Sequence, residues 1–422
     1  MYSVVANEIV DGGQPYVDAV ERKPPLLFWT YAAVFKVAGK FNWKALHIVA
    51  LVWTLGAMAG LYVIGSELFD RKTGLIAALF YGVFQSWWTW KTVAFDGEML
   101  MNLPIIWAWA IAFRRSSSRL RPELLLAGAL LGAAFLLKQP AAIAAIPFGI
   151  YLLLPSYRDS RSLTPTNSIL QATMLTAGFV AVVGLVTIVI WKQGILPEAF
   201  YWTIADHDIP HVFWERGILL TLAFIGACLP LVVGAIMACL DQSAIWAERR
   251  AERTALFGLL VASTLGVAPI DPFARTAGGA VLRTTLVPDD RTAPLATTTF
   301  GDVCVAGSHC YCPLNRSLDG AGSATGPSEA GQYLSTHSAL GDRIFVWGQT
   351  SKMYLEAQRR PASRYITTFP LTGYIFGGSV PGFDTRGRVL PGAWNTLERD
   401  FARHPPTYII DVQSDTRTLQ YQ

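Results

Sequence analysis

The stretch Arg22-Lys23-Pro24-Pro25-Leu26-Leu27-Phe28-Trp29 decides how the chain is organised, because a charged pair runs through two prolines into an apolar, aromatic segment. Proline restricts the residue before it and is tolerated in a first helical turn, so a helix is expected after the prolines and not before them. Aromatic rings collect at the level of lipid headgroups. The stretch indicates either an ordinary interfacial helix start or a functional lysine, Lys23, held where a polar loop meets a membrane.

The helix after the prolines, over about 24–38, is short for a membrane span, which needs about 20 apolar residues. We therefore expect it to lie along the membrane surface. Upstream, residues 1–21 indicate a short amphipathic helix that ends at Gly12-Gly13. Together, residues 1–44 are expected to form an outer loop with one amphipathic and one interfacial helix.

The composition indicates a polytopic membrane protein. Of the 422 residues, 52% are hydrophobic and only 15% are charged, which is too apolar for an ordinary soluble protein. The net charge of +4 lies in short loops, so it indicates membrane topology and no nucleic-acid partner. The five cysteines show no zinc-finger spacing. Residues 1–20 lack the basic start and apolar core of a cleavable signal peptide.

A transmembrane helical domain of about eight spans is predicted over 45–270. The predicted apolar segments are 45–66, 73–90, 100–113, 123–137, 141–154, 170–191, 217–240 and 254–270. Alternate loops are rich in Lys and Arg, and the positive-inside rule makes those loops cytoplasmic. They hold Arg71, Lys72, Arg114, Arg115, Arg119, Arg121, Arg158, Arg161, Arg249, Arg250 and Arg253. The loops on the other face are therefore predicted to be extracytoplasmic.

The pattern changes after residue 270. Residues 271–335 are rich in Thr, Ala, Gly and Asp without an apolar period, so an irregular segment is expected, either disordered or produced by a frameshift that is later reversed. Residues 336–422 show strand patterns at 342–348 and 407–412 and helical ones near 352–359 and 393–403. The predicted fold class is thus mainly α, a polytopic membrane helical bundle, with a small C-terminal soluble α/β domain on the outer face.

Two carboxylates, Asp96 and Glu98, stand at the start of an apolar helix on the predicted outer face. One interpretation is helix capping, because acidic residues in a first turn compensate the helix dipole. The other is general-base catalysis, which needs a carboxylate within hydrogen-bond reach of an acceptor hydroxyl. The sequence leaves both open.

Cations are predicted on the same face, at Arg22, Lys23 and Lys138, with Lys91 and Arg216. Cations beside carboxylates at a bilayer surface suit the binding of a lipid phosphate. The alternative is that these are lysines at helix ends whose heads reach water.

A metal site is not expected. His207 and His211 are four residues apart, but Pro210 interrupts the helix that would align them, and no third ligand is evident. A second group, Cys304, His309, Cys310 and Cys312, falls in the irregular segment.

Together, these motifs resemble the GT-C membrane glycosyltransferases related to protein O-mannosyltransferases and to the lipid A aminoarabinose transferase. The resemblance covers residues 1 to about 268 and 335–415. It is carried by Gly12-Gly13-Gln14-Pro15-Tyr16-Val17-Asp18, Lys23-Pro24-Pro25-Leu26, the acidic loop Asp96 to Glu98, the turn Lys138-Gln139-Pro140, and the tail from Asp342 to Tyr365.

The resemblance implies an inverting transfer of a sugar from a polyprenyl-phosphate donor to a hydroxyl of a protein, lipid or glycan on the outer face of the inner (plasma) membrane. By position, Lys23 would lie near the donor phosphate and Asp96 or Glu98 would be the second-loop acid. Asp18 and His211 are further candidates. No cofactor besides the lipid-linked donor is expected.

The chain departs from the family in two places. The family's first outer loop opens with an acidic motif that carries the main catalytic carboxylate, and Met1 falls just after that position. The carboxylate is therefore expected upstream of Met1, or the chain is inactive as given. In addition, the family has further membrane helices where residues 270–335 lie.

The chief alternative function is a transporter or lipid flippase, and a third is a non-catalytic membrane protein. A transporter should carry ionisable residues within its spans and broken helices at the midplane. Here the ionisable residues cluster in outer loops, which favours surface chemistry.

Overall fold

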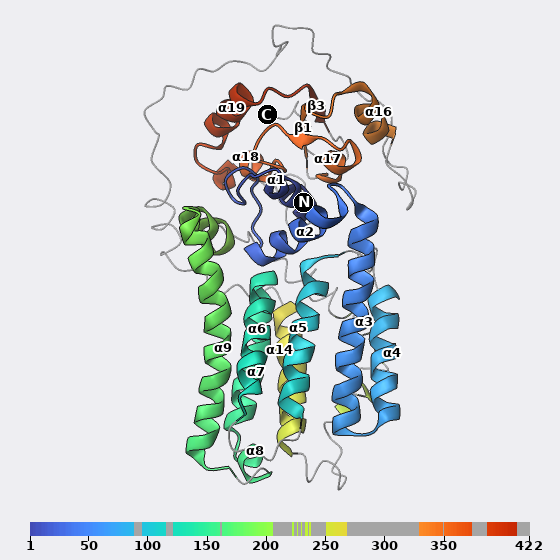
Figure 1. Cartoon of the computed structure of the whole chain (residues 1–422), viewed down its shortest axis with the longest axis vertical. Coiled ribbons are helices and arrows are strands. Elements are labelled where there is room, and N and C mark those ends of the chain that lie inside the picture. Colours follow the sequence, from blue (N-terminus) through green and yellow to red (C-terminus); the bar gives the residue numbers. More distant parts are fainter. Residues whose placement is uncertain are drawn as a thin grey trace.

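The computed structural model places a helical bundle at one end of the molecule and the N- and C-terminal segments together at the other (Figure 1). The structure describes residues 1–87, 95–114, 121–160, 163–205, 250–267, 329–348, 350–373 and 386–411, with a few positions between 222 and 237. Most of the predicted span at 217–240 and most of the predicted irregular segment lie outside the described residues.

The bundle consists of apolar helices that run up and down past one another (Figure 1). They are α3 (Trp43–Leu68), α4 (Arg71–Trp87), α5 (Gly97–Phe113), α6 (Glu123–Leu137), α7 (Ala142–Leu153), α9 (Pro165–Lys192) and α14 (Arg250–Val267), with the short α8 (Pro155–Ser160) at the far end. Among the described residues, α3 and α9 are long and apolar enough to cross a membrane. The helical character of the fold is confirmed, whereas the number of about eight spans stays a prediction.

Two glycine contacts allow neighbouring helices of the bundle to pack with their backbones touching. A Cβ atom added at Gly178 of α9 would lie 1.9 Å from the carbonyl oxygen of Leu125, and one added at Gly128 of α6 would lie 1.8 Å from that of Leu175. Small residues at helix crossings are the usual way for apolar helices to approach closely in a membrane.

The N-terminal segment forms two short helices between the bundle and the C-terminal part (Figure 1). Helix α1 (Tyr2–Val10) ends before Gly12, whose φ of +89° lies in a region that favours glycine. Helix α2 (Pro25–Ala38) begins at the second proline, with Pro24 extended before it. Its 14 residues extend about 21 Å, less than the hydrocarbon thickness of about 30 Å.

The C-terminal part contains a three-stranded parallel sheet in the order β2-β1-β3, with β1 in the centre. Its elements are α16 (Glu329–His337), β1 (Arg343–Trp347), α17 (Lys352–Glu356), β2 (Arg360–Pro361), α18 (Phe369–Thr372), η3 (Arg386–Arg388), α19 (Ala393–Arg403) and β3 (Tyr408–Asp411). Strands β1 and β3 and helix α19 lie where the sequence pattern predicts them.

Helix α16 is a correction, because residues 329–335 belong to the segment expected to be irregular. Ala330 and Leu334 are four residues apart and both are 2% exposed, so they form one buried face of a helical turn. Their packing onto the C-terminal core stabilises a helix that the local composition does not indicate.

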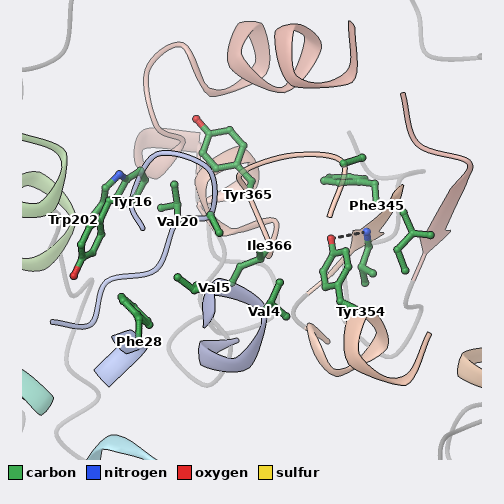
Figure 2. Packing of buried hydrophobic residues seen from close by; sticks show 14 of the residues in the cluster. Val4, Val5, Tyr16, Val20, Phe28, Trp202, Phe345, Tyr354, Tyr365 and Ile366 are labelled. Atoms are coloured by element: carbon green, nitrogen blue, oxygen red, sulfur yellow. Dashed lines mark hydrogen bonds between the residues drawn. The ribbon is translucent and has the colours of Figure 1, made fainter. Parts of the chain in front are cut away.

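The C-terminal part shares one hydrophobic core with the N-terminal segment. Figure 2 shows Val4 and Val5 of α1 close to Ile366, and Val20 close to Tyr365. The core continues to Trp202, beyond α9. A separate C-terminal α/β domain is therefore not confirmed, because this core belongs to both ends of the chain.

Charged pairs join the same two segments. Glu8 of α1 is 2% exposed and pairs with Arg360 of β2, whose Nε donates to Oε1 at 2.8 Å. Asp11 lies 3.4 Å from the Arg360 Nε and 2.7 Å from the Lys40 ammonium. The backbone N–H of Val20 donates to the carbonyl of Arg364 at 2.9 Å.

Arg360→Ala is expected to destabilise this junction by about 3 kcal/mol, because it leaves the buried Glu8 carboxylate without its cation. The result should be a lower melting temperature and faster hydrogen exchange in α1. Arg399→Ala is the matched control, since Arg399 is exposed and donates to Asn395 and Thr396 of its own helix, α19. Equal rates of hydrogen exchange of α1 in the two variants would contradict the role of the Glu8–Arg360 pair in this junction.

Arg121 lies in the connection between α5 and α6, one of the loops rich in Lys and Arg, but it is not a solvated loop charge. It is fully buried, and its guanidinium donates to the carbonyls of Ile111 and Ala112 at 2.5 and 2.9 Å and to Glu123 at 2.8 Å. Arg121 thus satisfies carbonyls in the last turn of α5, at the end of the bundle opposite the C-terminal part (Figure 1).

Candidate functional site

The candidate cations Arg22, Lys23 and Lys138 gather where the N-terminal loop meets the top of the bundle. Burial lowers the pKa of Lys23. The charge of Glu21 opposes that change, whereas the charges of Lys138 and Arg22 lower the pKa further. The charges around Lys23 therefore include Arg22 and Lys138, which the sequence predicts on the same membrane face.

Side chains from three parts of the chain hold the Arg22–Lys23 loop. The Tyr16 hydroxyl donates to the carbonyl of Lys23 at 2.7 Å, and the Gln139 amide donates to the carbonyl of Arg22 at 3.2 Å. The Arg22 guanidinium lies 4.6 Å from the centre of the Phe369 ring, a cation–π contact with α18. Tyr16 has a φ of +68°, a strained conformation for a residue with a side chain.

The acidic loop has two different environments. Asp96 caps α5, since its Oδ1 accepts from the Met99 N–H at 2.9 Å, so the capping interpretation is confirmed for this residue. Glu98 forms an ion pair with Lys138, with its side chain 51% exposed. The carbon chain of Lys138 passes the Gly97 position at van der Waals distance. The structure therefore brings Glu98 and Lys138 together, while general-base catalysis stays a prediction.

Sequence reasoning missed three residues at this site. Glu21 acts on Lys23 and on Tyr2, whose pKa is raised by burial and then by Glu21 and Glu98. The pKa of Tyr31 is raised by burial and then by Asp96 and Glu98. The rings of Tyr2 and Tyr31 are 5.9 Å apart, edge to face. In the sequence, the only indication for Glu21 was its position next to Arg22 and Lys23.

Not every predicted residue joins the cluster. Asp18 is exposed, accepts from the Gln14 N–H at 2.7 Å, and acts electrostatically on Arg343, Arg360 and Arg364 of the C-terminal part. His211 lies outside the described residues. The same holds for the other candidates His207, Lys91, Arg216, Cys304, His309, Cys310 and Cys312. Within the ranges that the structure describes, no three His, Cys, Asp or Glu side chains form a metal-binding group.

A cavity of about 380 Å³ lies elsewhere, between α7 and α14. Its lining is apolar and includes Ile146, Ile150 and Phe257, and none of the candidate cations or carboxylates. Its surroundings suit hydrocarbon, and the polar side chains of its described lining are the hydroxyls of Tyr151 and Thr254, which donate to Glu252 and to the Arg250 carbonyl.

Comparison with known proteins identifies the segment that carries this cluster. Residues 22–191 match the family model of the dolichyl-phosphate-mannose-protein mannosyltransferases. No curated protein and no solved structure was found to match the chain. The matched segment contains Lys23, Asp96, Glu98 and Lys138. The match confirms the resemblance seen in the sequence: over residues 22–191 the chain is similar to these mannosyltransferases, which supports a GT-C-like glycosyltransferase.

Proposed function

We propose that the chain is a membrane glycosyltransferase that moves a hexosyl or pentosyl group from a polyprenyl-phosphate donor to a hydroxyl acceptor. The observation that carries the proposal is the convergence of Arg22, Lys23 and Lys138 with Glu98 at one end of an apolar bundle. This convergence lies within the segment that matches the mannosyltransferase family, apart from contributions of Tyr16, Glu21 and Phe369.

The proposed reaction is a single displacement at the anomeric carbon of the sugar. The acceptor oxygen attacks from the side opposite the phosphate, the carbon–oxygen bond to the phosphate breaks, and the configuration inverts. A carboxylate, Asp96, Glu98 or Glu21, takes the hydroxyl proton. Lys23 and Lys138 stabilise the negative charge that develops on the departing lipid phosphate, because fixed cations act strongly in a partly buried site.

The charge distribution supports an extracytoplasmic site in the inner (plasma) membrane. Arg71 begins α4, Arg114 follows α5 and Arg158 lies in α8. The start of α4, the end of α5 and α8 lie opposite the end covered by the N- and C-terminal segments (Figure 1). Under the positive-inside rule those segments face the cytoplasm, so the candidate site faces outward. A lipid-linked donor and a hydroxyl acceptor would meet there, at the membrane surface.

A transporter or flippase would need polar groups along a path through the bundle. In the candidate spans, Lys44 and Glu67 lie near the two ends of α3, and Lys192 ends α9. These positions favour chemistry at the surface over passage through the core.

Sugar transfer in membranes containing the full chain tests the proposal. A radiolabelled sugar is supplied on a polyprenyl phosphate or on a nucleotide, and label is followed into protein, lipid and glycan. Label should pass only from the polyprenyl phosphate, and Asp96→Asn, Glu98→Gln and Glu21→Gln should identify the base. Movement of intact donor across the bilayer without bond cleavage would instead support a flippase.

The pH dependence of donor use follows from the lowered pKa of Lys23. Above its pKa the lysine is neutral and loses its attraction for phosphate, so kcat/KM for the donor should fall as pH rises. The fall should begin below the ordinary lysine pKa of about 10.4. In Lys23→Arg the fall should move to higher pH, because arginine stays charged. An unchanged profile in that variant would assign the titration to another group.

A further inference from the structure

We propose that Gln139 is a positioning residue that sets the separation between Lys138 and the Arg22–Lys23 loop, and thereby the fit of the cations around a phosphate. This inference rests on the proposed function. Its basis is a single side-chain amide that joins three segments distant in the sequence.

The amide nitrogen of Gln139 uses both of its hydrogens. Nε2 donates to the carbonyl of Arg22 at 3.2 Å and to the carbonyl of Thr203 at 3.1 Å. Both partners are acceptors only, so the NH₂ group and not the amide oxygen must face them. No other uncharged side chain of similar length offers two donors on one atom.

The neighbouring residue carries one of the cations. Lys138 directly follows α6 and is extended, with φ −157° and ψ 126°. Gln139 begins a short 3-10 helix, η1 (Gln139–Ala141), so the backbone conformation changes between the two residues. Lys138 accordingly reaches Glu98 on α5, whereas Gln139 reaches the Arg22 carbonyl. These two adjacent residues therefore contact both halves of the cation cluster.

The third contact ties the turn to a well-packed part of the chain. Thr203 lies in a π-helical turn, Tyr201–Ala205, that follows α10 (Leu196–Phe200), and Tyr201 and Trp202 are both buried. Such turns are rare and frequently occur at functional sites. Gln139 thus holds the cation loop against a segment that the shared core keeps in place.

Loss of this amide should loosen the loop without removing a charge. Gln139→Met keeps the length and volume of the side chain but leaves the carbonyls of Arg22 and Thr203 without this donor. Lys23 is still held by Tyr16 at the next carbonyl, so the loop should shift and not unfold. The cations then meet the phosphate in a less favourable geometry.

The test measures binding of farnesyl phosphate and of farnesol, the same chain without the phosphate, to the purified full chain. Gln139→Met should weaken farnesyl phosphate binding about tenfold and leave farnesol binding and the melting temperature unchanged. Gln139→Asn keeps the NH₂ group on a shorter side chain, so its affinity for farnesyl phosphate should lie between those of the unaltered chain and Gln139→Met. This variant replaces Gln139→Met in the test if the Met variant is unstable. Gln14→Met is the matched control, because Gln14 makes a similar amide contact, to the Gln193 carbonyl at 3.2 Å, away from the cations.

The outcomes separate this inference from the proposed function. If the unaltered chain binds farnesol as well as farnesyl phosphate, the proposed function and the inference both fail. If it prefers the phosphate, and Lys23→Ala but not Gln139→Met removes that preference, only the inference fails. Equal weakening of both ligands by Gln139→Met would also overturn it, since it would show a general structural defect.

Discussion

Lys23→Ala is expected to lower sugar transfer about 100-fold or more, the usual cost of removing one group that stabilises developing charge. Lys23 is partly buried, so little solvent screens the electrostatic attraction between its ammonium and a bound phosphate. Its backbone is fixed by Tyr16, and the preceding carbonyl is fixed by Gln139. With alanine at this position, the departing phosphate would have fewer cations around it, and water would replace one fixed charge.

The measurement is the initial rate of transfer at saturating acceptor, with protein amount determined in the same membranes. Lys40→Ala is the matched control, because Lys40 is a cation of the same segment that pairs with Asp11 and takes no part in the cluster around Lys23. It should transfer sugar at the unaltered rate. Full activity of Lys23→Ala would remove Lys23 from the site and, with it, the main support for phosphate binding there.

Gly178→Leu is expected to prevent folding of the bundle. The added Cβ would lie 1.9 Å from the Leu125 carbonyl oxygen, which belongs to backbone and cannot move aside as a side chain can. Helices α6 and α9 would have to separate, at a cost of at least about 3 kcal/mol. Because α9 also supplies Val186 and Ile190 to the core shared by both ends of the chain, the disturbance should reach the C-terminal part.

The measurement is the amount of monodisperse protein after extraction, with its melting temperature. Gly184→Leu is the matched control, since Gly184 lies on the same helix and an added Cβ there meets nothing within 4 Å. The control should resemble the unaltered protein. A Gly178→Leu variant that melts normally would show that the α6–α9 crossing tolerates a wider separation.

Elements defined by local patterns were predictable from the sequence. Helix α6 lies at 123–137 and α19 at 393–403, as the apolar and amphipathic periods indicate. Helix α1 ends before Gly12, and α2 begins at the second proline. Each of these boundaries depends on the conformational limits of a few adjacent residues.

Features that depend on distant contacts were not predictable. Strand β2 has only two residues, and its pairing with β1 defines it. The shared core joins α1 to strands more than 300 residues later in the chain. At the site, the sequence placed Lys23 and Lys138 on one face, but the amide of Gln139 that links their loops acts across 117 positions. Period and composition carry no information about such pairs.

The unequal lengths of the bundle helices have a consequence for the surrounding bilayer. Helix α9 has 28 residues and α6 has 15, a difference of about 20 Å along the helix axis. Exposed apolar residues on α6 and α7, such as Leu126 and Ile150, would meet lipid along a shorter stretch than those on α9. This is hydrophobic mismatch within one protein, and a bilayer responds to it by thinning locally. Lipid headgroups next to α6 and α7 would then lie deeper than elsewhere, which lowers a lipid-borne phosphate toward the turn at Lys138.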